Sequence, residues 1–124
     1  MPRLTRTPWP DNGLPGRPPP LSLAELEARL ARVRRGMEAR GWGALAVYGD
    51  REHAANLHWL TGFDPRFEEA VLIVGPAGDP AVLVGNECYG MAGAAPLPMR
   101  RELFQDLSLP AQPRERSRRL PDIL

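Results

Sequence analysis

The sequence predicts one α/β domain, built on a mixed β-sheet flanked by helices. Its length of 124 residues suits a single domain. One segment shows a clear helical period with a capping signal at its start. Short apolar runs bounded by glycine and proline indicate strands, at residues 44–48, 70–74 and 81–84. The resulting order, in which helices alternate with strands around one hairpin, is typical of a mixed sheet.

The first 21 residues are expected to form a Pro-rich arm, and the folded domain covers residues 22–124. Seven of the 15 prolines fall within the first twenty positions, which favours an extended or polyproline II conformation. We expect this arm to pack along the domain surface, with Trp9 and Leu14 as its anchors. A ligand for an aromatic-lined groove is the alternative interpretation.

The first helix is predicted to begin after Ser22, which forms a capping box with Glu25, and to stop at Gly41. Its apolar positions recur at helical spacing and form a one-sided stripe: Leu23, Leu26, Leu30, Val33 and Met37. Glu25 can pair with Arg29 one turn later. The run Arg29, Arg32, Arg34 and Arg35 is interpreted as a solvated face in preference to a nucleic-acid interface, because acidic residues are interleaved.

The middle of the chain alternates strands and helices. Residues 44–48 predict a buried strand, and Asp50 is expected to cap a helix over 51–59. Residues 60–67 predict a loop that Gly62 breaks and Pro65 fixes. The runs 70–74 and 81–84 predict an antiparallel hairpin around a turn at 76–80.

The last third is predicted to hold two helices and one strand. Asn86 is expected to cap a short helix that ends near Gly93, a strand follows at 101–104, and a helix begins at Pro113 and runs to Leu124. Because Leu120, Ile123 and Leu124 start an apolar face at the end of the sequence, we expect a fragment whose sheet is truncated on its C-terminal side.

Charge and composition argue against several classes of function. The net charge is +1, and residues 41–93 carry Arg51 and Arg66 against seven acids, a net −5. A polyanion would need a coherent basic field, so nucleic acid is not an expected partner. No stretch approaches 18 apolar residues, so no membrane span is expected. A single cysteine and no signal-peptide pattern predict a cytoplasmic protein without an intramolecular disulfide.

Local motifs predict no catalytic site. His53 and His58 are five residues apart, about 140° around a helix, and do not share a face as zinc-binding histidines at i,i+4 do. Cys88 is interpreted as a small buried thiol. A two-metal nuclease would need an acid on the first strand, and residues 45–48 contain none. The spacing of Gly36, Gly41 and Gly43 fits neither the Walker phosphate loop nor the glycine-rich loop that binds dinucleotides.

One segment resembles a known family. Asn56-Leu57-His58-Trp59-Leu60-Thr61-Gly62-Phe63 is similar to the N-x-x-Y/W-L-T-G-F segment of the creatinase, prolidase and aminopeptidase P metallopeptidases, which lies in their N-terminal, non-catalytic domain. The continuation Asp64-Pro65-Arg66-Phe67-Glu68-Glu69-Ala70 and the later Gly85-Asn86-Glu87 resemble a bacterial Xaa-Pro peptidase branch. The resemblance covers about residues 22–124 and implies a ribonuclease H-like sheet.

The same resemblance implies what such a domain does. In that family a second, C-terminal domain holds two divalent ions, often Mn²⁺ or Co²⁺, on two Asp, one His and two Glu, and none of these ligands maps onto this chain. We therefore expect no cofactor, no catalytic residue and no hydrolysis from the chain alone. The implied roles are contacts in a homo-oligomer and part of a substrate entrance, with Phe63, Asp64, Arg66 and Phe67 as entrance candidates.

A second interpretation from a different class remains open. The chain could be a free-standing interaction module that binds another protein through its Pro-rich arm or its Arg-rich helix.

Overall fold

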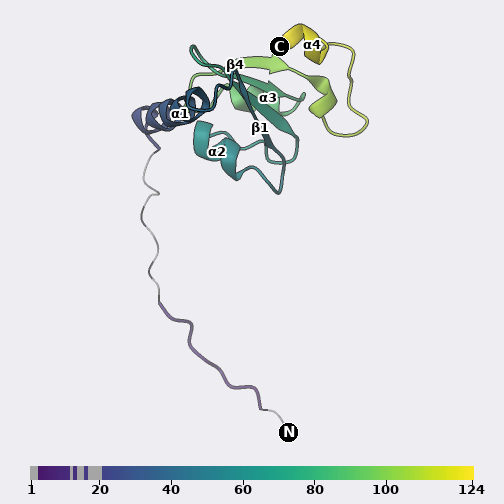
Figure 1. The fold of residues 1–124 in the computed structure, drawn as a ribbon. Coiled ribbons are helices and arrows are strands. Elements are labelled where there is room, and N and C mark those ends of the chain that lie inside the picture. The colour runs from purple at the N-terminus through teal and green to yellow at the C-terminus, as the bar shows by residue number, and fades with distance from the viewer. Residues whose placement is uncertain (1–2, 12, 14–15, 17–20) are drawn as a thin grey trace.

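The computed structural model describes residues 3–11, 13, 16 and 21–124 (Figure 1). The described helices and strands are, in chain order, α1 (Leu23–Glu38), β1 (Leu45–Gly49), α2 (Ala55–Thr61), β2 (Ala70–Val74), β3 (Ala81–Val84), α3 (Cys88–Ala92), β4 (Arg100–Leu103), the 3₁₀ turn η1 (Gln105–Leu107) and α4 (Leu120–Ile123). The strands 70–74 and 81–84 have the predicted bounds, and the strands near 45 and 101 each differ from prediction by one residue at both ends.

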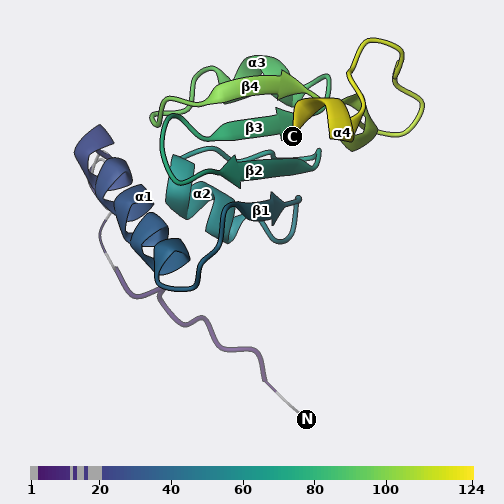
Figure 2. The same cartoon turned by 45° about the horizontal axis from the view of Figure 1, so that its top comes forward.

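The four strands form one open sheet in the order β1-β2-β3-β4 (Figure 2). β1 pairs with β2, and β2 with β3, in antiparallel fashion, whereas β4 joins β3 in parallel. The parallel pair requires a crossover, and α3 lies within it. The predicted mixed α/β sheet is therefore confirmed.

The two faces of the sheet are covered unequally. Helices α1, α2 and α3 pack on one face, where the main core forms around Leu26, Leu57, Leu72, Val82 and Cys88. The other face carries a smaller cluster in which Ile123 of α4 packs against Ala81 and Leu83. Figure 1 shows α2 and α4 on opposite sides of the strands.

The start of α1 follows the prediction closely. Ser22 Oγ accepts a hydrogen bond from Glu25 N at 3.2 Å, and Leu26, Leu30 and Met37 of the predicted stripe are buried. The Glu25 carboxylate pairs with Arg29 Nε at 2.8 Å, as expected. Leu23, at the edge of the stripe, is exposed.

Three predicted helix boundaries are wrong. Asp50 Oδ1 accepts from the backbone N–H of Glu52 and His53, which closes a single turn, and α2 begins only at Ala55. The predicted cap of α3 by Asn86 is wrong because its side chain bonds to Gln112 and the Pro113 carbonyl. Residues 113–119 are not helical.

Residues 113–119 do not form a helix, because a side chain elsewhere in the chain accepts the hydrogen bonds of their backbone amides. Gln105 is buried, and its Oε1 accepts from the N–H groups of Arg116 and Ser117 at 2.5 and 3.0 Å. The guanidinium of Arg114 donates to the carbonyls of Asp106 and Ser108. A helix over these residues would need those donors for itself.

Leu21, the last residue of the Pro-rich arm, packs against the main core, whereas the described residues 3–11, 13 and 16 are exposed. Trp9 is 94% exposed, so the predicted anchoring by this residue is not found, and Leu14 lies outside the described residues. Among the residues that the structure describes, no helix is long and apolar enough to cross a membrane.

Candidate functional site

The site begins with a loop, residues 62–69, that connects α2 to β2. Its side chains divide cleanly between the interior and the surface. Phe63, Pro65 and Glu68 are buried, whereas four other residues of the loop are exposed: Asp64, Arg66, Phe67 and Glu69. This alternation holds the backbone firmly while it presents charged and aromatic groups outward.

The first half of the loop is fixed by Thr61 and Gly62. Thr61 Oγ1 donates to the Leu57 carbonyl at 2.7 Å and accepts from Phe63 N at 3.0 Å. Gly62 ends α2 with a φ of +72°, and a Cβ there would lie 2.8 Å from Pro96 Cδ. The Leu-Thr-Gly-Phe sequence thus encodes a helix stop, a capped turn and an aromatic anchor in four residues.

The second half is fixed by the buried carboxylate of Glu68, which is 2% exposed. Its Oε2 accepts from Cys88 N at 2.8 Å and its Oε1 from Glu87 N at 3.3 Å, so Glu68 supplies the cap that α3 lacks from its own sequence. A Cβ at Gly85 would lie 2.8 Å from Glu68 Oε2 and 2.7 Å from Ser108 Cα. Glycine at 85 therefore makes room for this carboxylate.

The outward side of the loop carries Asp64, Arg66 and Phe67. Asp64 Oδ1 accepts from Arg66 N at 2.8 Å, an Asx turn that holds Arg66 at a φ of +57°. Phe67 is 45% exposed. A cationic and an aromatic side chain therefore stand next to each other on a well-anchored turn.

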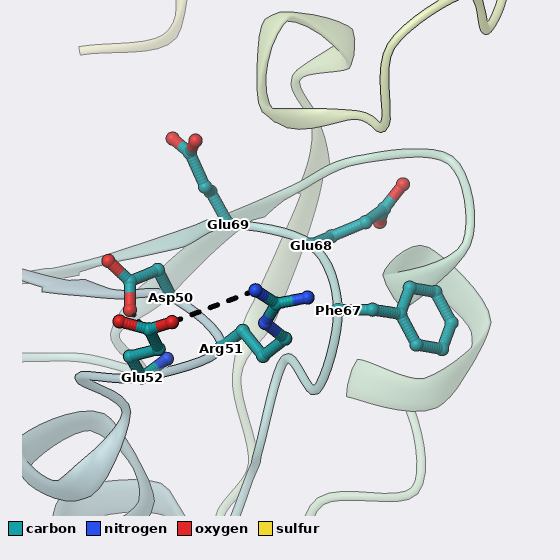
Figure 3. Close-up of a pocket in the computed structure, with 6 residues that line it drawn as sticks. All are labelled: Asp50, Arg51, Glu52, Phe67, Glu68 and Glu69. Carbon is teal, nitrogen blue, oxygen red and sulfur yellow. Dashed lines mark hydrogen bonds and ion pairs between the residues drawn. The ribbon is translucent and has the colours of Figure 1, made fainter.

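A second segment, the turn after β1, faces this loop. Asp50, Arg51 and Glu52 of that turn line a shallow hollow of about 290 Å³ together with Phe67, Glu68 and Glu69 of the loop (Figure 3). The Arg51 guanidinium points into the hollow and pairs with Glu52 at 3.6 Å. A neighbouring hollow of about 420 Å³ is lined by Arg51, Asp64, Arg66 and Phe67.

Acidic groups dominate one side of this surface. Hydrogen bonds from the backbone N–H of Glu52 and then of His53 hold the pKa of Asp50 below its usual range. Partial burial of the Tyr48 phenol, followed by the nearby carboxylates of Glu69 and Asp50, raises the pKa of Tyr48. The neighbouring hollow is the more cationic part, because Arg51 and Arg66 line it with Asp64 as its one acidic residue.

Three of the four predicted entrance residues are brought together, and the fourth is not. Asp64, Arg66 and Phe67 line one hollow, whereas Phe63 is 4% exposed and packs in the main core. The sequence interpretation missed Arg51, which reaches the same hollow from the turn after β1. Arg51 and Arg66 are the only cations between residues 41 and 93, and that isolation was the available signal.

The other chemically suggestive residues do not form a site. Cys88 is buried, its Sγ donates to the Pro65 carbonyl at 2.9 Å, and burial raises the pKa of its thiol to about 12. His53 Nδ1 lies 3.1 Å from Asp50 Oδ1 in an exposed pair. Within the described part of the chain, no three His, Cys, Asp or Glu residues gather as metal ligands would, so these residues do not fit a dinuclear metal centre.

Comparison with known proteins finds likeness at the level of structure. No protein-family model matches the sequence, and no curated protein matches it either. Among solved structures, dipeptidase PepE from Mycobacterium ulcerans is 17% identical, with a TM-score of 0.51 over 65% of this chain and 23% of that one.

Two further structures are similar. A Creatine_N superfamily domain of a dipeptidase from Streptococcus thermophilus is 24% identical, with a TM-score of 0.49 over 59% of this chain and 53% of that one. A proline dipeptidase from Streptococcus agalactiae is 20% identical, with a TM-score of 0.49 over 71% of both chains.

The aligned part thus spans about half the length of the Streptococcus thermophilus structure and less than a quarter of PepE. At 17% identity, the likeness to PepE establishes the fold alone. The α/β fold implied by the Leu-Thr-Gly-Phe segment is confirmed, and this chain is folded like part of a dipeptidase.

Proposed function

We propose that this chain is the non-catalytic N-terminal domain of a Xaa-Pro aminopeptidase or dipeptidase-like metallopeptidase, in which the 62–69 loop forms part of the substrate entrance. The observation that carries the proposal is the division of this loop between a buried, hydrogen-bonded side and a charged, aromatic outer side. Binding groups gather on exposed loops that a rigid scaffold positions.

Each outward residue has a chemical task in this proposal. The Arg66 guanidinium is suited to a substrate carboxylate, because its planar fork can donate two parallel hydrogen bonds. Arg51, across the same hollow, adds positive charge. The exposed ring of Phe67 offers an apolar surface of the right kind for a prolyl ring, and Asp64 holds Arg66 in place through its backbone N–H.

The proposal assigns the chemistry of peptide cleavage to another domain. Two divalent ions, Mn²⁺ or Co²⁺, would belong to the catalytic domain, since the described residues of this chain offer no cluster of ligands for them. Calorimetry on the purified chain with Mn²⁺, Co²⁺ or Zn²⁺ should show only weak binding. One stoichiometric site at micromolar affinity, about −8 kcal/mol, would contradict this assignment.

Contacts within a homo-oligomer are the second proposed role. The sheet face opposite the main core is only partly covered by α4, and Tyr48 of β1 is exposed on it. Partly covered apolar sheet faces are typical association surfaces. Light scattering should detect a dimer at high protein concentration, and a strictly monomeric profile there would contradict this role.

The entrance role is tested in the two-domain protein. Arg66→Ala and Phe67→Ala should each lower kcat/KM on a Xaa-Pro peptide by at least about tenfold, which corresponds to about 1.4 kcal/mol, without a matching fall in Tm. Arg35→Ala, which removes an exposed arginine on α1, is the matched control. Unchanged kinetics, or a loss that unfolding explains, would make the loop a purely structural element.

The alternative is a free-standing interaction module, and its proposed binding surface on the Arg-rich helix loses support. Arg29 and Arg32 lie over the Trp59 ring, and Arg34 donates to the carbonyls of Gly75 and Gly78, so three arginines of α1 already have partners within the chain. The arm remains a candidate surface for this alternative. An arm peptide spanning residues 1–21 that captures a defined partner without the domain would support it.

A further inference from the structure

The outer edge of β1 is open for pairing. β1 is the outermost strand of the sheet, and no strand in the described part of the chain pairs with its outer side (Figure 2). Its residues, Leu45–Gly49, include neither a charge nor a proline. Natural sheets normally protect an edge with one of those features or cover it with another segment, so this edge is suited to a partner strand.

The ladder between β3 and β4 fixes the direction of the backbone groups across the sheet. Phe104 N donates to the Val84 carbonyl at 2.8 Å, so the backbone groups of Val84 point toward β4. Those of Leu83, the preceding residue, point toward β2, because the direction alternates along a strand. Leu83 stands opposite Val71, and the backbone groups of Leu72 therefore point away from β3 and toward β1.

The same alternation identifies the free backbone groups of β1. Leu72 stands opposite Val47, so the N–H and C=O of Val47 bond to β2. The N–H and C=O of Ala46 and Tyr48 point to the outer side, where no backbone group of the described residues pairs with them. The edge therefore offers two donors and two acceptors to a partner strand.

We propose that a second copy of the chain pairs with this edge, β1 against β1, in antiparallel fashion around a two-fold axis at Val47. In this register Ala46 of each copy exchanges both of its backbone hydrogen bonds with Tyr48 of the other, so the free groups of both residues are satisfied. The proposal rests on the homo-oligomer role proposed above and identifies a surface for it.

The side chains of β1 fit this register. Leu45 of one copy stands opposite Gly49 of the other, and the exposed Tyr48 ring stands opposite Ala46 on the other face of the sheet. Val47 alone meets its own copy. Each larger side chain therefore faces a smaller residue across the pair, and the two strands can approach to the normal spacing of a sheet.

An apolar hollow gives the second copy a place to bury side chains. It has a volume of about 400 Å³ and is lined by Val33 of α1, by Trp59 and Leu60 of α2, and by residues 45–48 of β1. Leu45 and Val47 pack on the main core side of the sheet, so the same residues of the second copy lie on that side, beside the hollow. Burial of these side chains adds an apolar contribution to the pairing.

Charge favours the antiparallel direction. Arg40, which lies over the Trp42 ring at 5.4 Å, precedes β1, whereas Asp50 and Glu52 follow it. Antiparallel pairing brings the acidic turn of each copy to the Arg40 end of the other, and the two-fold axis repeats this contact. Parallel pairing would place like charges side by side.

The first test is sedimentation equilibrium on the full chain. Five paired residues span about 17 Å, which makes the contact a small interface and predicts a dissociation constant of about 10–100 µM. Ala46→Pro removes an outward N–H and should raise this constant by at least about tenfold. Ala46→Gly keeps the N–H and is the matched control. Slow hydrogen exchange at Leu72 and Val82, in the central strands, reports that each variant is folded.

The second test is a disulfide crosslink that reports the register. In a Cys88→Ala background, Val47→Cys should form a covalent dimer under mild oxidation, because its Cα would lie about 4.5 Å from that of its copy. Ala46→Cys is the matched control. Its Cα atoms would lie about 8 Å apart in the two copies, which is too far for a disulfide, so it should stay monomeric under the same oxidation.

The outcomes separate this proposal from the function proposed above. A chain that stays monomeric at high concentration would contradict both the β1 pairing and the homo-oligomer role. A dimer that withstands Ala46→Pro, or that crosslinks through Ala46→Cys as readily as through Val47→Cys, would overturn the β1 pairing alone and move the homo-oligomer contact to another surface. The entrance role is measured separately, as kcat/KM of the Arg66 and Phe67 variants.

Discussion

Arg66 occupies a backbone conformation that glycine adopts far more readily than arginine. Its φ of +57° lies in the left-handed region, where a side chain other than that of Gly, Asn or Asp is strained. Gly62, four residues earlier, adopts a similar conformation without that cost. The backbone at Arg66 therefore lowers the stability of the folded domain. A substitution at this residue can change stability and binding in opposite directions, so the two effects can be measured separately.

We expect Arg66→Gly to stabilise the domain by about 1 kcal/mol, because it relieves the strain at positive φ. Arg66→Ala should bring no such gain, since alanine keeps the Cβ. Urea unfolding of both variants measures the difference. Equal stability of the glycine and alanine variants would contradict a strained backbone at this residue.

Cys88 gives the protein a pH dependence whose sign follows from its burial. Its pKa is raised from 9.0 to about 12 in the folded state, so between these values the unfolded thiol loses its proton while the folded thiol keeps it. The unfolded state then binds fewer protons, and stability falls as pH rises. Below about pH 9 this effect is absent.

The test compares how the free energy of unfolding changes with pH in the parent and in Cys88→Ala. The free energy of unfolding of the parent should fall more steeply between about pH 9 and about pH 10.5 than that of Cys88→Ala, because only the parent contains this thiol. Urea titrations at several pH values measure both slopes, and the other titrating groups cancel in the comparison. Parallel slopes would show that the thiol ionises as readily in the folded state as in the unfolded one.

At the scale of elements, the predictable features are those that neighbours in sequence determine. The start of α1 could be predicted because Ser22 and Glu25 are one helical turn apart. The β2–β3 hairpin could be predicted because its apolar runs flank a turn of glycine and proline. In both cases the partners that satisfy the backbone are local.

The features that the sequence analysis missed depend on partners that are distant in the sequence. The cap of α3 comes from Glu68, about twenty residues earlier in the chain, and the amides of Arg116 and Ser117 are taken by Gln105. Arg51 reaches the candidate site from a different loop than Arg66. No local pattern encodes these partners, because each depends on how the sheet brings separate loops together.

Gly85 is the position where the α3 cap can be tested by size alone. Gly85→Ala should cost about 1–3 kcal/mol, since the new Cβ would lie within 3 Å of Glu68 and the Ser108 backbone. Gly90→Ala, inside α3, meets nothing within 4 Å and should stabilise the domain by up to about 1 kcal/mol. Denaturant unfolding compares the two, and a tolerated Gly85→Ala would contradict the close approach of the carboxylate.

At the scale of the whole molecule, the sheet separates a well-buried half from a lightly covered one. The face under α1, α2 and α3 holds most of the buried apolar residues, whereas α4 contributes Ile123 alone to the buried residues on the opposite face. The sequence predicted the mixed sheet from the order of its elements. It could not predict this imbalance, because the last helix proved to be four residues long and not twelve.

Arg34 links α1 to the turn of the β2–β3 hairpin, two parts that are far apart in the sequence. The turn of the β2–β3 hairpin closes over few residues, with Ile73 paired to Ala81, so the hairpin can form early. Arg34 Nε donates to the Gly75 carbonyl at 3.0 Å across 41 residues, and Nη2 donates to the carbonyl of Gly78. These bonds can form only after α1 has docked.

The consequence is kinetic. We expect the bonds of Arg34 to form after the hairpin and after the folding barrier. Arg34→Ala should then accelerate unfolding and leave the folding rate nearly unchanged, with a total loss of about 1–2 kcal/mol in the free energy of unfolding. Stopped-flow experiments in urea measure the folding and unfolding rates. If the folding rate fell enough to account for the whole loss of stability, α1 would dock before the folding barrier, and the prediction would be wrong. If Arg34 acts as expected, this one side chain extends the lifetime of the folded state without helping the chain to reach it.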